Sequence, residues 1–233
     1  MRTQDWLTVP PAERVMNSLG HTHRVTGKSF RKERQPMSLQ AYLETLHRCR
    51  GPREVVIPTM GAAREWMQLG THPLDFIYAP SAMGQAPSLG LGLALARPDL
   101  QVTVLNGDGC QWMNLGCLLT IAGCRPANLR LVICDNNSYE VTGGQRTAAS
   151  GQSTDWRQIA RGCGWERVHE FSTPAEWAGA WDDLRQLPGP RLLVWRYPPD
   201  PSGTVPKSPA PPPGRARQLA ERLRALPMAT HWA

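Results

Sequence analysis

Side chains that can bind a metal ion gather at two turns of the sequence, and each turn follows a run of apolar residues. The run LQVTVL leads into residues 106–109 (NGDG), and the run LRLVIC leads into residues 135–139 (DNNSY). Asp108 offers carboxylate oxygens and Asn136 an amide oxygen, and Mg²⁺ in proteins prefers such oxygens together with phosphates. The glycines beside Asp108 allow a tight turn and a close approach to a bulky anion. Together the two turns predict a site for a magnesium diphosphate.

The elements around these turns must bring them to one place. Apolar, β-branched runs alternate with helical patterns along the chain, which is typical of a doubly wound, mostly parallel α/β sheet with helices on both faces. Ligands of such sheets bind beyond the carboxyl ends of the strands, where both turns lie. A helix that begins just after Gly109 would also direct its N-terminal amides toward a phosphate.

The pattern predicts the following elements. Strands are expected over residues 53–59, 75–80, 100–106, 129–136, 165–171 and 191–197. Helices are expected over residues 38–49, 87–98, 112–123, 155–164 and 174–187.

The GDG turn and the NN turn resemble the cofactor motif of the thiamine diphosphate-dependent enzymes. Asn136 follows Asp108 by 28 positions, and both stand at the ends of β-branched strands. Residues 139–145 (YEVTGGQ) are similar to the TGGQ stretch of sulfopyruvate and phosphonopyruvate decarboxylases, in their diphosphate-binding part. The resemblance covers roughly residues 38–197 and implies the thiamine diphosphate-binding fold.

The resemblance assigns roles residue by residue. Asp108, the side chain of Asn136 and the backbone carbonyl of Ser138 would bind Mg²⁺. Many relatives have glycine where Ser138 stands, and a carbonyl ligand tolerates that change. The remaining implied cofactor contacts are Ser81, Met83, Gly84, Gly107, Gly109, Cys110 and Tyr139.

Three of these contacts have a more specific implied role. The bulky side chain of Met83 would bend the cofactor, and the carbonyl of Ser81 would hold its amino group. Cys110 would face the phosphates with its amide rather than its thiol. The implied substrate-pocket residues are Thr142, Gly143, Gly144 and Gln145.

The activating glutamate of this family lies on a second, pyrimidine-binding domain. Such a domain needs well over a hundred residues, and only about 37 precede the resemblance here. The resemblance therefore implies a separate partner chain that carries this glutamate, a hetero-oligomer, and no certain catalytic residue on the present chain.

The implied activity is the decarboxylation of a small-molecule 2-oxo acid, such as sulfopyruvate or phosphonopyruvate, to an aldehyde and CO₂. Two alternatives are an acetolactate synthase-like carboligase and a regulatory subunit without chemistry. The TGGQ stretch favours the decarboxylase over the carboligase. The intact Asp108, Asn136 and Met83 argue against the regulatory subunit.

Proline marks the C-terminal boundary of the predicted domain, and a polar, weakly periodic segment precedes the domain. The expected parts are an N-terminal extension (1–37), the cofactor-binding domain (38–197), a proline-rich linker (198–214) and a basic helix or tail (215–233). In the tail, leucines 219, 223 and 226 recur at helical spacing and are expected to dock on the domain.

Composition excludes several classes of protein. The chain has 233 residues and a net charge of +7, but it has no recognisable nucleic-acid motif. No apolar run approaches the roughly 18 residues of a membrane helix, and the N-terminus lacks the apolar segment of a signal peptide. Six cysteines without a CxxC pair do not predict a zinc site. We therefore expect a cytoplasmic protein that binds neither nucleic acid nor membrane.

Overall fold

The computed structural model describes most of the expected domain and the helix that follows it. The described residues are 38–79, 82–147, 154–200, 204, 207 and 209–228. The expected extension (1–37) and Ser81 lie outside the described residues.

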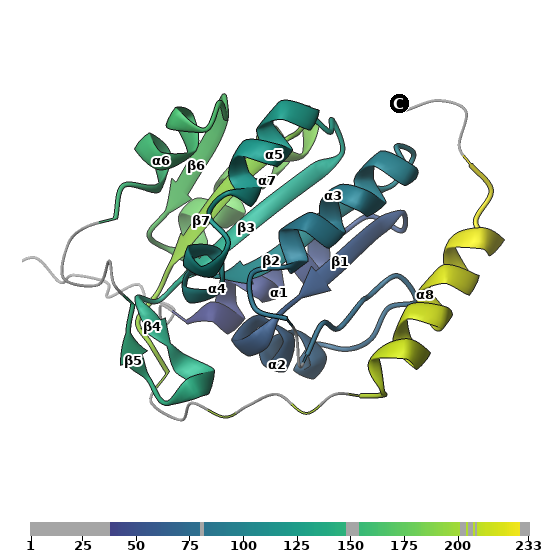
Figure 1. Ribbon diagram of the computed structural model, residues 1–233, viewed down its shortest axis with the longest axis horizontal. Coiled ribbons are helices and arrows are strands. Elements are labelled where there is room, and N and C mark those ends of the chain that lie inside the picture. The colour runs from purple at the N-terminus through teal and green to yellow at the C-terminus, as the bar shows by residue number, and fades with distance from the viewer. Residues whose placement is uncertain are drawn as a thin grey trace, which may run out of the picture. The chain divides into compact units, whose positions relative to one another are not determined.

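Five parallel strands form the central sheet, as the sequence predicts (Figure 1). Their order in space is β1 (Glu54–Pro58), β2 (Gln101–Gly107), β3 (Leu129–Asp135), β7 (Arg191–Arg196) and β6 (Arg167–Phe171). Every residue of the central strand β3 is buried, because helices cover both faces of a parallel sheet. The predicted α/β fold is confirmed.

Helices form a layer on each face of this sheet. One face is covered by α1 (Leu39–Cys49), α2 (Met60–Gln68) and α7 (Pro174–Gln186). The other is covered by α3 (Ala86–Ala96), α5 (Cys117–Cys124) and α6 (Trp156–Gly162). Side chains of β1 alternate between the two cores, with Val55 and Ile57 in one and Val56 in the other. The short helix α4 (Asp108–Met113) links β2 to α5.

The turn after β3 folds into a small hairpin that the sequence did not predict. It consists of β4 (Ser138–Tyr139), the 3₁₀ helix η1 (Glu140–Thr142) and β5 (Gln145–Arg146). The helix α2 was not predicted either. Both elements lie at the carboxyl end of the sheet.

The predicted strand 75–80 is wrong as a regular strand. Residues 75–78 lie alongside β1 but form only two isolated bridges, Val56 to Asp75 and Thr59 to Tyr78. Tyr78 donates its N–H to the carbonyl of Pro58 at 3.0 Å. Pro58 has no N–H with which to continue the ladder, so the pairing is interrupted there.

The predicted helix 112–123 is divided into α4 and α5. Asn114 leaves the helical conformation, and its side chain donates a hydrogen bond to the carbonyl of Gly84 at 2.9 Å. Asparagine and glycine favour helix ends over helix interiors. The sequence Asn-Leu-Gly at residues 114–116 therefore separates two helices where the apolar periodicity indicated one.

The C-terminal helix α8 (Pro212–Ala225) begins inside the segment that we expected to be linker. Proline is well suited to the first turn of a helix, because the N–H that it lacks would have no partner there. Leu219 is buried as part of the core cluster that also contains Leu74 and Phe76, and Leu223 and Leu226 pack against that cluster. The predicted docking of the leucine stripe is confirmed. In the described part of the chain, no helix is long and apolar enough to cross a membrane.

Candidate functional site

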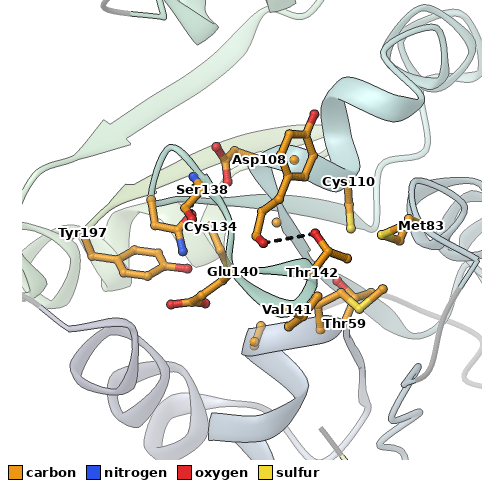
Figure 2. A pocket seen from close by; sticks show the side chains of 17 residues that line it. Thr59, Met83, Asp108, Cys110, Cys134, Ser138, Glu140, Val141, Thr142 and Tyr197 are labelled. Carbon is orange, nitrogen blue, oxygen red and sulfur yellow. Dashed lines mark hydrogen bonds between the residues drawn. The ribbon is translucent and has the colours of Figure 1, made fainter. Parts of the chain in front are cut away.

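A cavity of about 40 Å³ lies at the carboxyl ends of β1, β2 and β3 (Figure 2). Of the predicted site residues, Met83, Gly107, Asp108, Gly109, Cys110, Asn136, Ser138, Tyr139 and Thr142 line it. The register pairs Gly107 of β2 with Cys134 of β3, so the two predicted turns emerge side by side. The structure thus brings the GDG and NN turns to one cavity, as the strand-end argument predicts.

Asp108 is a buried carboxylate at the base of this cavity. Burial, and then the charge of Asp135, raise its pKa to about 7. Backbone hydrogen bonds from Gly109 and Asn136 oppose the shift, and the hydroxyl of Thr147 lies 3.4 Å from the carboxylate. None of the described arginines, lysines or histidines forms an ion pair with Asp108. A bound cation would supply that missing positive charge.

The turn after β3 is held in a fixed conformation. Asn137 adopts a left-handed backbone with φ of 57°. The carboxylate of Asp135 accepts hydrogen bonds from the indole N–H of Trp156 at 2.9 Å and from Arg196 at 2.7 Å. The amide oxygen of Asn136 accepts the N–H of Ser138 at 2.9 Å. Asn136 is buried, so its oxygen is positioned before any ligand arrives.

Asp108, Asn136 and Ser138 fit a hard divalent cation. All three residues line one cavity, and carboxylate, amide and backbone carbonyl oxygens are the kinds of ligand that Mg²⁺ binds before it completes its shell with phosphates and water. Among the described residues there is no group of three His, Cys, Asp or Glu side chains that could hold a metal. A metal held by one carboxylate, one amide oxygen and one backbone carbonyl does not require such a group. The role of the three residues as ligands stays a prediction.

The two glycines beside Asp108 differ in what surrounds them. A Cβ atom on Gly109 would lie 2.5 Å from the ring of Tyr139, whereas one on Gly107 would meet nothing within 4 Å. Gly109 is therefore required by the packing of Tyr139, and not only by the approach of an anion as we expected. Gly107 leaves open space above the base of the cavity.

Met83 and Cys110 line the cavity, whereas Gly84, the third predicted contact in this region, is not among the lining residues. Met83 is 36% exposed, and Figure 2 shows the sulfur of Cys110 directed toward it. Gly84 has φ of +86°, and a Cβ atom there would lie 2.8 Å from Cβ of Asn114. Burial raises the pKa of the Cys110 thiol to about 11, although a backbone hydrogen bond from Gly84 opposes the shift. The thiol is therefore directed toward the segment of Met83 and Gly84, and it stays protonated at neutral pH.

The predicted substrate-pocket residues are only partly at the cavity. Thr142 lines it, and its hydroxyl donates to the carbonyl of Tyr139 at 3.2 Å (Figure 2). Gly143, Gly144 and Gln145 are exposed and do not line this cavity. Both glycines have positive φ and form the tip of the β4–β5 hairpin.

The cavity also contains residues that the sequence analysis missed. Thr59 and Met60 follow β1, so the strand-end rule could have identified them. No sequence motif or strand-end position identifies Glu140 or Tyr197 as a site residue. Glu140 is buried and accepts the N–H of Asp200 at 2.7 Å, and burial raises its pKa.

Comparison with known proteins identifies relatives of this arrangement. Residues 59–194 match the family described as thiamine pyrophosphate enzyme, C-terminal TPP binding domain. The beta subunit of sulfopyruvate decarboxylase from Methanocaldococcus jannaschii is 40% identical over 119 residues, which are 51% of this chain and 62% of that subunit. Phosphonopyruvate decarboxylase from Streptomyces hygroscopicus is 35% identical over 172 residues, which are 73% of this chain and 41% of that enzyme. The chain thus spans less than two thirds of either relative.

A solved structure shows the same fold. It is described as a thiamin diphosphate-dependent enzyme from Mycobacterium smegmatis and is superimposed with a TM-score of 0.60 at 20% identity. The match covers 70% of this chain and 32% of that one. At this identity the similarity shows the fold alone.

Proposed function

The chain belongs to the thiamine pyrophosphate enzymes through their C-terminal TPP binding domain, and on this premise we propose that it is the beta-type subunit of a cytoplasmic 2-oxo acid decarboxylase. Its site takes thiamine diphosphate and Mg²⁺, and its substrate is sulfopyruvate, phosphonopyruvate or a close analogue. Residues 38–197 carry the site. A separate chain carries the pyrimidine-binding domain and the activating glutamate.

The observation that carries the proposal is the buried carboxylate of Asp108 beside the Asn136 turn, which forms no ion pair with any residue that the structure describes. A carboxylate held out of water without a cation is unfavourable, and the amide and carbonyl oxygens of Asn136 and Ser138 have no positive charge to offer. A Mg²⁺ ion bound to a diphosphate supplies the charge and uses all three oxygen donors.

The residues of this chain would position the cofactor rather than react. Asp108, Asn136 and Ser138 would hold the metal, the open space above Gly107 would take the diphosphate, and Met83 would contact the organic part of the cofactor at the cavity edge. When bound, thiamine diphosphate supplies a thiazolium carbon that adds to the ketone and accepts the electron pair released with CO₂.

The size of the cavity supports a site completed by a second chain. Pockets for cofactors usually measure about 300–1,000 Å³, whereas this cavity measures about 40 Å³. This chain would therefore supply one wall of the site. The name of the Methanocaldococcus relative, a beta subunit, supports the same arrangement.

We base the proposed substrate on the names of the relatives and on the exposed hairpin that carries the TGGQ sequence. A sulfonate or phosphonate group binds best where several hydrogen-bond donors converge. Thr142 lines the cavity, and Gln145 and Arg146 are exposed on the same hairpin. We propose that these side chains face the acidic end of the substrate once the second chain is in place.

A titration with thiamine diphosphate and Mg²⁺, with and without the pyrimidine-domain chain, tests the proposal. We expect Mg²⁺-dependent binding that is strengthened by the second chain, followed by turnover of sulfopyruvate or phosphonopyruvate to an aldehyde. A hydroxyketone product would instead identify a carboligase. Absence of cofactor binding under both conditions would identify a non-catalytic subunit.

A further inference from the structure

A second cavity lies at the amino end of the sheet, and we call it the amino-end cavity. It measures about 560 Å³, within the range of about 300–1,000 Å³ that is usual for small-molecule sites. Its walls come from Gln101 and Arg191, the first residues of β2 and β7, and from the C-terminal ends of α3, α5 and α7. Figure 1 shows that β2 and β3 begin at the end of the sheet opposite the β4–β5 hairpin. The amino-end cavity is therefore separate from the cavity that contains Asp108.

The charged side chains that line the amino-end cavity are all positive. They are Arg125, Arg185 and Arg191, and no aspartate or glutamate is among the described lining residues. Arg185 pairs with Asp182 at 3.1 Å, and Asp182 does not line the cavity. Arg125 forms no ion pair within the described part of the chain. Three arginines and one aspartate leave an excess of two positive charges.

Arg191 is the buried member of this set. It is 1% exposed, and its terminal nitrogens donate to the carbonyl of Leu184 and, at 2.8 Å, to the amide oxygen of Gln101. Both acceptors are neutral, and Nε has no hydrogen-bond partner among the described residues. Glu54 attracts Arg191 but already pairs with Arg130 at 2.9 Å. Burial, and then the charge of Arg130, lower the pKa of Arg191 to about 9. The fold thus holds the charged guanidinium without a counter-ion of its own.

The ends of the helices explain part of this arrangement. A cation near the C-terminus of a helix is favourable, and Arg125 follows α5 while Arg185 lies in the last turn of α7. These two exposed arginines would need no ligand. Arg191 differs from them, because a buried cation without a negative partner is unfavourable. A bound anion would supply that partner, just as a cation would at the buried carboxylate of Asp108.

We infer that the amino-end cavity binds a small organic phosphate. Guanidinium groups match the oxygens of a phosphate in geometry and donate paired hydrogen bonds to them. A phosphate monoester carries about −1.5 to −2 charges near pH 7, which balances the excess of two positive charges better than a single carboxylate does. Leu95, Pro126 and Leu187 provide an apolar wall for the organic part. This inference does not depend on the proposed decarboxylase activity.

A native cysteine in the wall of the cavity reports on binding. Cys124 is an exposed free thiol that lines the cavity, whereas Cys163 is half-buried and lies outside the lining. In the full chain, we expect saturating AMP to slow the alkylation of Cys124 by iodoacetamide at least fivefold and to leave the rate at Cys163 unchanged. Residue-resolved mass spectrometry measures both rates. Inorganic phosphate tests the head group alone, and adenosine tests the organic part without its charge.

Two matched double variants test the role of charge. Arg125→Gln with Arg185→Gln removes the two exposed charges of the cavity and should raise the AMP concentration that half-protects Cys124 at least tenfold. Arg157→Gln with Arg161→Gln removes two exposed arginines of α6 that do not line the cavity. Protection of Cys124 in this second variant should require the same AMP concentration as in the parent.

The outcomes decide for or against the site. Protection of Cys124 by AMP, with or without protection by inorganic phosphate, supports it. Protection by inorganic phosphate but not by AMP would reject an organic ligand and overturn the inference. Absence of protection by either anion at millimolar concentration would overturn it as well. Equal protection by adenosine and AMP, or unchanged AMP protection in the variant without Arg125 and Arg185, would show that the arginines do not bind the ligand and would also overturn it.

Discussion

Buried charges lie at both ends of the parallel sheet, and their surroundings differ. At the amino end, Arg130 pairs with Glu54 at 2.9 Å, and Thr103 donates to the same carboxylate at 2.6 Å. The guanidinium of Arg130 also lies 4.8 Å from the ring centre of Trp181. At the carboxyl end, Asp108 is equally buried but forms no ion pair with any described residue.

This difference in ion pairing distinguishes charged residues that stabilise the fold from charged residues that bind a ligand. A buried pair whose members satisfy each other can be explained by the fold alone. A buried carboxylate without a cation makes the isolated chain less stable, and it becomes favourable only when a positively charged ligand is present. Asp135 shows the same distinction at the carboxyl end of the sheet, because it pairs with Arg196 at 2.7 Å, whereas Asp108 pairs with no described residue.

The largest effect is expected at the amino end. Arg130→Met would leave the buried carboxylate of Glu54 without its ion-pair partner and should lower the free energy of unfolding by about 3–5 kcal/mol. Urea denaturation measures the loss. The double variant Arg130→Met with Glu54→Gln should recover most of it, because both charges are then removed. A loss below about 1 kcal/mol in the single variant would contradict the comparison.

At the carboxyl end of the sheet, the buried carboxylate of Asp108 should make the stability of the protein depend on pH. The folded pKa of Asp108 is about 7, compared with an ordinary value of 3.8, so the folded state binds a proton that the unfolded state releases. Without metal, this group's contribution to stability should fall by about 2–4 kcal/mol as the pH rises from about 4 to about 8, and stay constant above. Asp108→Asn should remove that part of the pH dependence. An identical profile in parent and variant would show that the carboxylate is not destabilised by burial.

A smaller effect should distinguish the two glycines of the GDG turn. Gly109→Ala places a Cβ atom 2.5 Å from the Tyr139 ring, and overpacking of this kind costs about 1–3 kcal/mol. Gly107→Ala is the matched control, because its Cβ atom would meet nothing within 4 Å. Thermal unfolding of both variants measures the difference. Equal melting temperatures would mean that Tyr139 moves freely and does not support the turn.

The sequence predicted the parts of the site that depend on strand ends. Continuous apolar strands separated by helical patterns predict a parallel sheet, and such a sheet brings Asp108 and Asn136 to the same end. The broken helix at Asn114 and the interrupted pairing at Pro58 depend on single residues that act against a strong apolar pattern. Each residue interrupts its element through a contact with another segment, Asn114 with Gly84 and Pro58 with residues 75–78, and these contacts form only in the folded chain.

Other parts of the site could not be predicted because they come from tertiary contacts. Glu140 lines the cavity because the hairpin after β3 places it there. Its carboxylate accepts a hydrogen bond from the N–H of Asp200, which lies 60 positions later in the chain. The hydroxyl of Thr147 lies 3.4 Å from the carboxylate of Asp108, and its N–H donates to the carbonyl of Asn137 at 3.1 Å. No local pattern indicates either contact.

The most direct test of the account is the Mg²⁺ dependence of thiamine diphosphate binding in the parent chain and in Asp108→Asn, each measured by calorimetry together with the pyrimidine-domain chain. We expect Mg²⁺ to strengthen cofactor binding by the parent at least a hundredfold, equivalent to about 2.7 kcal/mol, and to leave binding by the variant unchanged. Equal Mg²⁺-dependent affinity in the two proteins would show that the unpaired carboxylate at the carboxyl end of the sheet does not hold the metal.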